Sequence, residues 1–171
     1  MSPTLSQQLD ALARNLIPAA LGILLVLFST IPYSLPAFGA VAPNFVLMAV
    51  FYWAVFRSDA LSPITVFLIG LLQDILIGTP PGLNAAILVL VRTFAVSQNR
   101  VFRGKSFMVL WFGFVVVGLS AAFAEWLITA IYHLDFLDPR LVLVRAAMTI
   151  ALFPFLVWLF SWTHQKLLPQ N

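Results

Sequence analysis

The chain contains no cysteine and few charged side chains. Without cysteine there is no disulfide, no thiolate nucleophile and no cysteine metal ligand, so redox chemistry is disfavoured. Charged residues make up 9% of the 171 residues, against about 25% in soluble domains, while 62% are hydrophobic. A soluble fold cannot hide that much apolar surface. The composition therefore predicts an integral membrane protein, with residues 1–171 forming a single membrane domain.

Recognisable catalytic motifs are also missing. The sequence has no nucleophile-elbow pattern, H-E-x-x-H motif, P-loop or glycine-rich dinucleotide motif. His133, Asp135 and Asp138 are metal-ligating residue types, but the spacing H-x-D-x-x-D is weak evidence for a metal site. We therefore predict no enzyme activity, no metal and no cofactor. The net charge of +3 does not indicate nucleic-acid binding, because the basic residues lie mostly between apolar segments.

Six apolar runs follow one another along the chain, and they predict an all-α bundle of about six transmembrane helices. The predicted spans cover residues 16–38, 42–56, 61–78, 83–96, 107–132 and 141–162. Pro32 and Pro36 should kink or end the first span, and Thr79-Pro80-Pro81-Gly82 should form the turn between the third and fourth. A cleavable signal peptide is an alternative for the first run, which is, however, too long and is followed at once by further runs.

The connections between these runs differ in their basic residues, which predicts an orientation. With six spans, all but one of the Lys and Arg residues outside the spans fall on one side: Arg14, Arg57, Arg100, Arg103, Lys105 and Lys166. Only Arg140 falls on the other. Because cytoplasmic loops are enriched in Lys and Arg, both termini are predicted to be cytoplasmic.

Four ionisable residues lie inside predicted spans and form a candidate intramembrane charge cluster: Asp74, Arg92, Glu125 and Arg145. At 1.5 Å per residue, three of them lie about 6–12 Å from the outer ends of their helices, and Arg92 lies about 15 Å down. The three outer residues can meet in the outer half. Buried charges there are expensive unless they are paired. Ion pairs that hold the bundle together are the favoured interpretation; snorkelling, a proton or ion path, and a partner or ligand site remain open.

Two stretches carry a family resemblance. One is Ala42-Pro43-Asn44 leading into Phe51-Tyr52-Trp53, and the other runs from Gly70 through Gly82 to Ala85. Together they resemble the rod shape-determining protein MreD family over about a quarter of the chain. The matching positions, which we take as a candidate partner or packing face, are Pro43, Asn44, Tyr52, Trp53, Gly70, Asp74, Gly78 and Gly82. Gly70 and Gly78 flank Asp74 at i−4 and i+4, which predicts a groove of small residues for a neighbouring helix.

The resemblance implies a role in the bacterial cell-elongation complex. Such a protein binds MreC, works with MreB, RodA and a penicillin-binding transpeptidase, and supports rod shape and lateral peptidoglycan synthesis. The family is also similar in fold to the S components of energy-coupling-factor vitamin transporters. That similarity supplies an alternative function, a small-molecule-binding membrane protein, although the first run lacks the A-x-x-x-A docking motif of those proteins. Glu125 and Arg145 lie outside the matching motifs and inherit no family role.

Overall fold

The computed structural model describes residues 19–28, 42–59, 61–102, 105–134 and 138–167. Within these ranges the chain consists of helices and short connections, with no strand. The helices are Ala19–Phe28, α3 (Phe45–Phe56), α4 (Pro63–Ile77), α5 (Leu83–Ser97), α6 (Asn99–Phe102), α7 (Phe107–His133) and α8 (Pro139–Leu167). Each predicted span contains one helix, and α6 is a short extra helix in the basic connection. Pro32, Pro36 and Asp135 lie outside the described residues.

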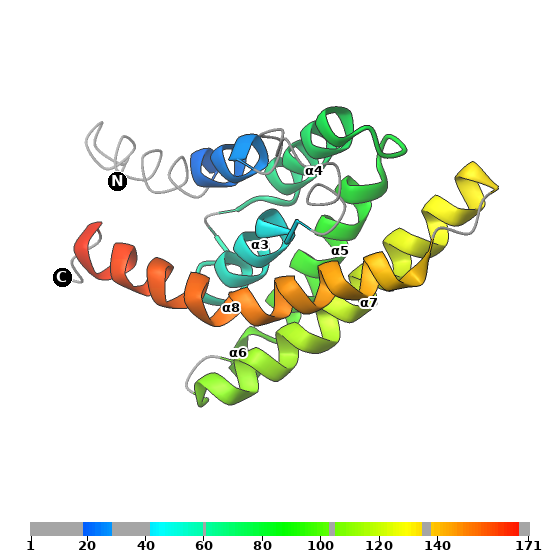
Figure 1. Ribbon diagram of the computed structural model, residues 1–171. Coiled ribbons are helices and arrows are strands. Elements are labelled where there is room, and N and C mark those ends of the chain that lie inside the picture. The colour runs from blue at the N-terminus through cyan, green and yellow to red at the C-terminus, as the bar shows by residue number, and fades with distance from the viewer. Residues whose placement is uncertain (1–18, 29–41, 60, 103–104, 135–137, 168–171) are drawn as a thin grey trace, which may run out of the picture.

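The helices fall into two length classes. α7 and the first 21 residues of α8, Pro139–Leu159, are long and apolar enough to cross a membrane. The apolar helices α3, α4 and α5 have 12, 15 and 15 residues, which is fewer than a straight span requires. Figure 1 shows the end of α7 lying beside the start of α8 and the two helices diverging toward their other ends, with α3 and α4 on one side of this pair.

Helix α3 occupies the centre of the bundle. Every residue from Val46 to Val55 is buried, so this helix has no side that faces lipid. It packs against α5 and α8. Phe51 is the focus of an aromatic group, with its ring centroid 5.8 Å from Phe102, 5.3 Å from Phe114 and 5.8 Å from Phe153. These contacts join α3 to α6, α7 and α8.

Local sequence signals explain where the central helices begin and end. The Asn44 side chain accepts a hydrogen bond from the Leu47 amide at 3.0 Å, which caps α3. Ser62 caps α4 in the same way, with Pro63 at the first position of the helix. α4 ends at Gly78, whose φ of 78° is the left-handed conformation that glycine adopts without strain. The predicted turn at residues 79–82 is confirmed, and it brings α5 back alongside α4.

Close packing of α4 on α5 depends on Gly70. A Cβ atom added there would lie 2.4 Å from the Cα and 2.7 Å from the backbone nitrogen of Ala85. Small residues allow two membrane helices to approach at backbone distance, where dispersion forces are strongest. Of the two glycines of the predicted groove, Gly70 receives α5 of the same chain, whereas Gly78 lies in the turn with no atom within 4 Å of an added Cβ.

We predict that Gly70→Ala lowers the free energy of unfolding by about 1–3 kcal/mol, because the backbone of α5 must move away. Gly118→Ala is the matched control: its Cβ would lie 3.6 Å from the nearest side-chain atom, an ordinary contact distance. Thermal unfolding of both variants in detergent measures the difference. Equal stability of the two variants would contradict the proposed close approach.

Candidate functional site

The Asp74 carboxylate joins the end of α4 to the beginning of α5. Its Oδ1 accepts hydrogen bonds from the Thr79 hydroxyl at 2.7 Å and from the backbone and side-chain nitrogens of Asn84, both at 2.9 Å. Its Oδ2 accepts from the Gly82 amide at 2.9 Å. Gly82, the residue before α5, has no side chain with which to cap that helix. Asp74 supplies the missing cap from the preceding helix, and its negative charge is favoured at a helix N-terminus.

Glu125 and Arg145 form an ion pair between α7 and α8. The Arg145 Nη1 lies 2.7 Å from the Glu125 Oε1, and the Arg145 Nε donates to the Ala42 carbonyl at 3.2 Å. The pair therefore also holds the segment that leads into α3. Thr149 strengthens this junction, because its hydroxyl donates to the Arg145 carbonyl at 2.8 Å and accepts from the Asn44 amide at 3.0 Å.

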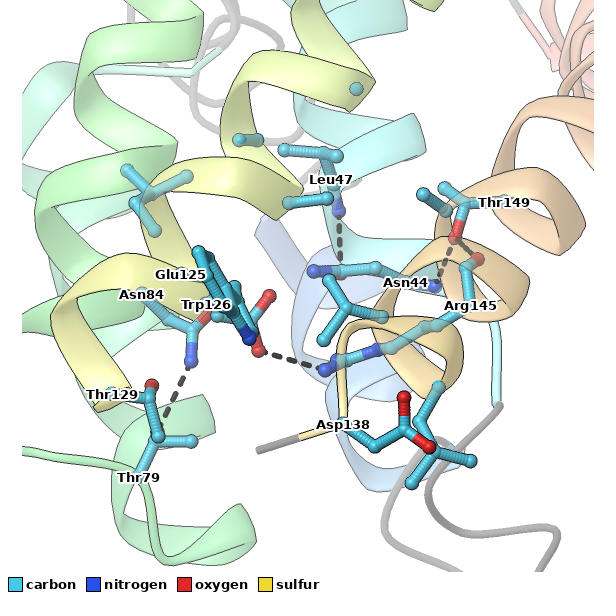
Figure 2. A pocket seen from close by; sticks show the side chains of 17 residues that line it. Asn44, Leu47, Thr79, Asn84, Glu125, Trp126, Thr129, Asp138, Arg145 and Thr149 are labelled. Atoms are coloured by element: carbon cyan, nitrogen blue, oxygen red, sulfur yellow. Dashed lines mark hydrogen bonds and ion pairs between the residues drawn. The ribbon is translucent and has the colours of Figure 1, made fainter. Parts of the chain in front are cut away.

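A cavity of about 220 Å³, which we call the polar cavity after the polar side chains among its lining residues, lies beside this ion pair. It opens between α3, α5, α7 and α8, and the ion pair lines it (Figure 2). The side chains of Arg145 and Glu125 are 24% and 19% exposed, so neither is sealed in the core. The polar lining residues are Asn44, Thr79, Asn84, Glu125, Thr129, Asp138, Arg145 and Thr149. Asp74 does not line the cavity itself, but its hydrogen-bond partners Thr79 and Asn84 do, so it lies directly behind the lining residues.

Arg92 lies apart from the other intramembrane charges. Its Nε donates to the Leu61 carbonyl at 2.6 Å and its Nη2 donates to the Ser58 carbonyl at 3.2 Å. Both acceptors belong to the connection between α3 and α4, at the end of the bundle away from the polar cavity. Of the four predicted cluster members, the structure pairs Glu125 with Arg145, places Asp74 behind the cavity wall, and directs Arg92 to the opposite end.

The family-motif positions lie largely inside the bundle. Tyr52 and Trp53 are buried on α3, Gly70 contacts α5, and Asn44 caps α3. Pro43 directly precedes that cap, while Gly78 and Gly82 both take the left-handed conformation of the turn. These contacts are made within the one chain, and the role of these positions as a partner or packing face stays a prediction.

Sequence reasoning missed three polar residues of the site. Asn84 bonds Asp74, Thr149 bonds Asn44, and the buried Gln73 places its amide nitrogen 3.5 Å from the Asn44 Oδ1. Each is an uncharged polar residue within a predicted apolar span. An uncharged polar residue surrounded by apolar residues in a membrane helix also needs a hydrogen-bond partner. Their position within apolar spans could therefore have marked these three residues as candidates.

A metal centre has no support in the described residues. No group of three His, Asp or Glu side chains that could hold an ion occurs among them. The described members of the H-x-D-x-x-D spacing are His133 and Asp138. Asp138 instead accepts a hydrogen bond from the Arg140 amide at 2.9 Å, at the start of α8.

Comparison with protein families identifies the chain. Residues 11–162 match the family described as rod shape-determining protein MreD. No curated protein and no solved structure matches the chain in the corresponding comparisons. The family match extends well beyond the two motif stretches and includes the helices that carry Glu125 and Arg145.

We predict that Asp74→Ala lowers the free energy of unfolding by about 3 kcal/mol or more, because each buried donor left without an acceptor costs about 1–3 kcal/mol. Asp74→Asn should have a smaller effect, since an amide oxygen still accepts. Asp59→Ala is the control, because Asp59 is an exposed acid in a connection. Thermal unfolding in detergent measures the three variants. Wild-type stability of Asp74→Ala would rule out the capping role.

We also predict that Glu125 and Arg145 are energetically coupled. A double-mutant cycle with Glu125→Gln, Arg145→Gln and the double variant should give a coupling free energy of about 0.5–3 kcal/mol. A parallel cycle with Glu125→Gln and Arg140→Gln should give none, because Arg140 is exposed near the start of α8. Equal coupling free energies in both cycles would mean that the cycles report the net charge of the protein and not a direct interaction between Glu125 and Arg145.

Proposed function

Because the chain belongs to the rod shape-determining protein MreD family, we propose that it is a non-enzymatic, multi-pass protein of the bacterial inner membrane that supports lateral peptidoglycan synthesis by binding MreC. The family assignment itself makes it a rod shape-determining membrane protein. MreB, RodA and a penicillin-binding transpeptidase are the further members of the proposed complex. The observation that carries the proposal is the family match over residues 11–162.

The uses of the polar side chains support a scaffold over an enzyme. Asp74 caps α5, Arg92 holds a connection, and Arg145 joins α8 to α7 and to the start of α3. In these three cases the polar group fixes the position of a helix or a loop. A catalytic pair would instead hold a nucleophile within hydrogen-bond reach of a base. These contacts serve to maintain one fixed shape, which is what a binding partner requires.

The arrangement of the connections supports the proposed orientation. Ser58 and Leu61 are tied to the later part of α5 through Arg92, whereas Gly82 is tied through Asp74 to the end of α4, at the beginning of α5. Successive connections therefore lie at opposite ends of this part of the bundle. Arg57 and Arg100 belong to the end that we assign to the cytoplasm, as the distribution of basic residues predicts. Cytoplasmic termini and a single membrane domain are parts of the same proposal.

A second candidate is a small-molecule-binding protein resembling a vitamin-transporter S component. The observation that favours it is the polar cavity, which is lined by charged and amide side chains within a mostly apolar bundle. A thermal-shift screen of the purified chain against vitamins discriminates the two. A tight vitamin ligand would support this candidate, and its absence together with MreC binding would support the scaffold.

The scaffold proposal predicts a cellular and a biochemical result together. Depletion of the protein should give round or swollen cells, and MreC should co-purify with the tagged chain from its own membrane. Asp74→Ala should reduce both complementation and MreC recovery, because the α4–α5 pair loses its cap, whereas Asp59→Ala should retain both. Normal cell shape after depletion, or no MreC recovered with a folded chain, would refute the proposal.

A further inference from the structure

The polar cavity adjoins a second hollow, which lies between α5 and α7. This apolar groove has a volume of about 330 Å³ and is lined by Leu90, Phe94, Val116, Val117, Ser120 and Ala124 together with neighbouring residues. Ile87 and Ala121 line both hollows. The groove opens toward the outside of the bundle, since Leu90 is 69% and Val116 60% exposed. The two hollows thus meet at Ile87 and Ala121, which we call the ridge, with the ion pair on one side of it and lipid-facing apolar groups on the other.

One face of each flanking helix changes from polar to apolar along this path. On α5 the lining residues pass from Asn84 through Ile87 to Leu90, at helical spacing. On α7 they pass from Glu125 through Ala121 to Val117, four residues apart. A ligand that fits both hollows must therefore be an amphiphile, with an ionic or hydrogen-bonding head and an apolar chain.

The charged side chains of the polar cavity indicate which head group the amphiphile carries. A guanidinium carries five N–H donors, and among the described residues Arg145 uses its Nε for Ala42 and its Nη1 for Glu125. Its remaining donors suit a phosphate oxygen, which guanidinium groups bind strongly. Glu125 and Asp138 line the same cavity and supply acceptors for a cationic group. A single anionic group would meet two carboxylates, whereas a head with both charges can satisfy the arginine and an acid together.

We propose that the polar cavity and the apolar groove form a binding site for one phospholipid whose head carries a phosphate and an ammonium group. The phosphate contacts Arg145, the ammonium contacts Glu125, and an acyl chain crosses the ridge of Ile87 and Ala121 into the groove. In the proposed orientation the cavity lies in the outer half of the bundle, at the depth of a lipid head in the outer leaflet. The site does not depend on MreC binding, and its test does not measure MreC.

Native mass spectrometry of the full chain in detergent, with added phosphatidylethanolamine, tests the proposal. One lipid should remain bound to the wild-type chain. Arg145→Gln should reduce retention about tenfold, which corresponds to the roughly 1.4 kcal/mol of one lost charged contact. Arg140→Gln should leave it unchanged. Glu125→Gln should remove the preference for phosphatidylethanolamine over phosphatidylglycerol, which has a phosphate but no ammonium.

A substitution on the surface of α7 tests separately whether the apolar groove holds the acyl chain of the lipid. Ser120→Phe fills the apolar groove and should lower lipid retention severalfold, whereas Leu119→Phe, at an exposed position that does not line the groove, should not. Because Ser120 is exposed, this variant decides the question even if Arg145→Gln fails to fold. Glycerophosphoethanolamine, the head without its chains, should bind far more weakly than the lipid.

Three results would overturn the proposal. The first is a wild-type chain that retains no phosphatidylethanolamine. The second is equal retention by wild type, Arg145→Gln and Ser120→Phe, which would indicate nonspecific lipid. The third is equal binding of glycerophosphoethanolamine and the lipid, which would assign the cavity to a small soluble phosphate ester and leave the groove without a role.

Discussion

The capping of α5 by the Asp74 carboxylate is the interaction on which the rest of the bundle depends. A membrane interior offers no water to the first amides of a helix, so these donors need a protein acceptor. Asp74 provides it from α4, and its position is fixed because Gly70, one turn earlier, lets the two backbones touch. The cap and the close approach therefore require each other. Together they set the direction of α5, which forms one wall of the polar cavity and of the apolar groove.

The sequence predicts the helices well because both lipid and protein interior select apolar residues. The predicted turn at 79–82 follows from residue types with known local preferences, and the same reasoning explains the capping by Asn44, which was not predicted. Counting residues along a helix also gives the depth of a charge. It does not give the direction in which that charge faces, so the contacts of Arg92 with the Leu61 and Ser58 carbonyls could not be predicted.

Hydropathy also cannot separate central helices from peripheral ones in a membrane protein. α3 and α7 are both strongly apolar, yet Val46 to Val55 are all buried, whereas Phe112, Val116 and Phe123 on α7 are exposed. In a soluble protein a polar face would mark the outer side of a helix. In lipid that mark is absent, because tails and side chains are equally apolar. Uncharged polar residues such as Asn84 and Thr149 are the better guide to the interior.

The burial and length of α3 have a consequence for the biogenesis of the protein. Its 12 residues extend about 18 Å, well short of a hydrocarbon core of about 30 Å. Alone in a bilayer, this segment would leave its ends in hydrocarbon. In the bundle α5, α7 and α8 pack against it, and two of these are synthesised long after it. We therefore expect the central helix to remain near the translocation machinery, or at the membrane surface, until the last helices have been made.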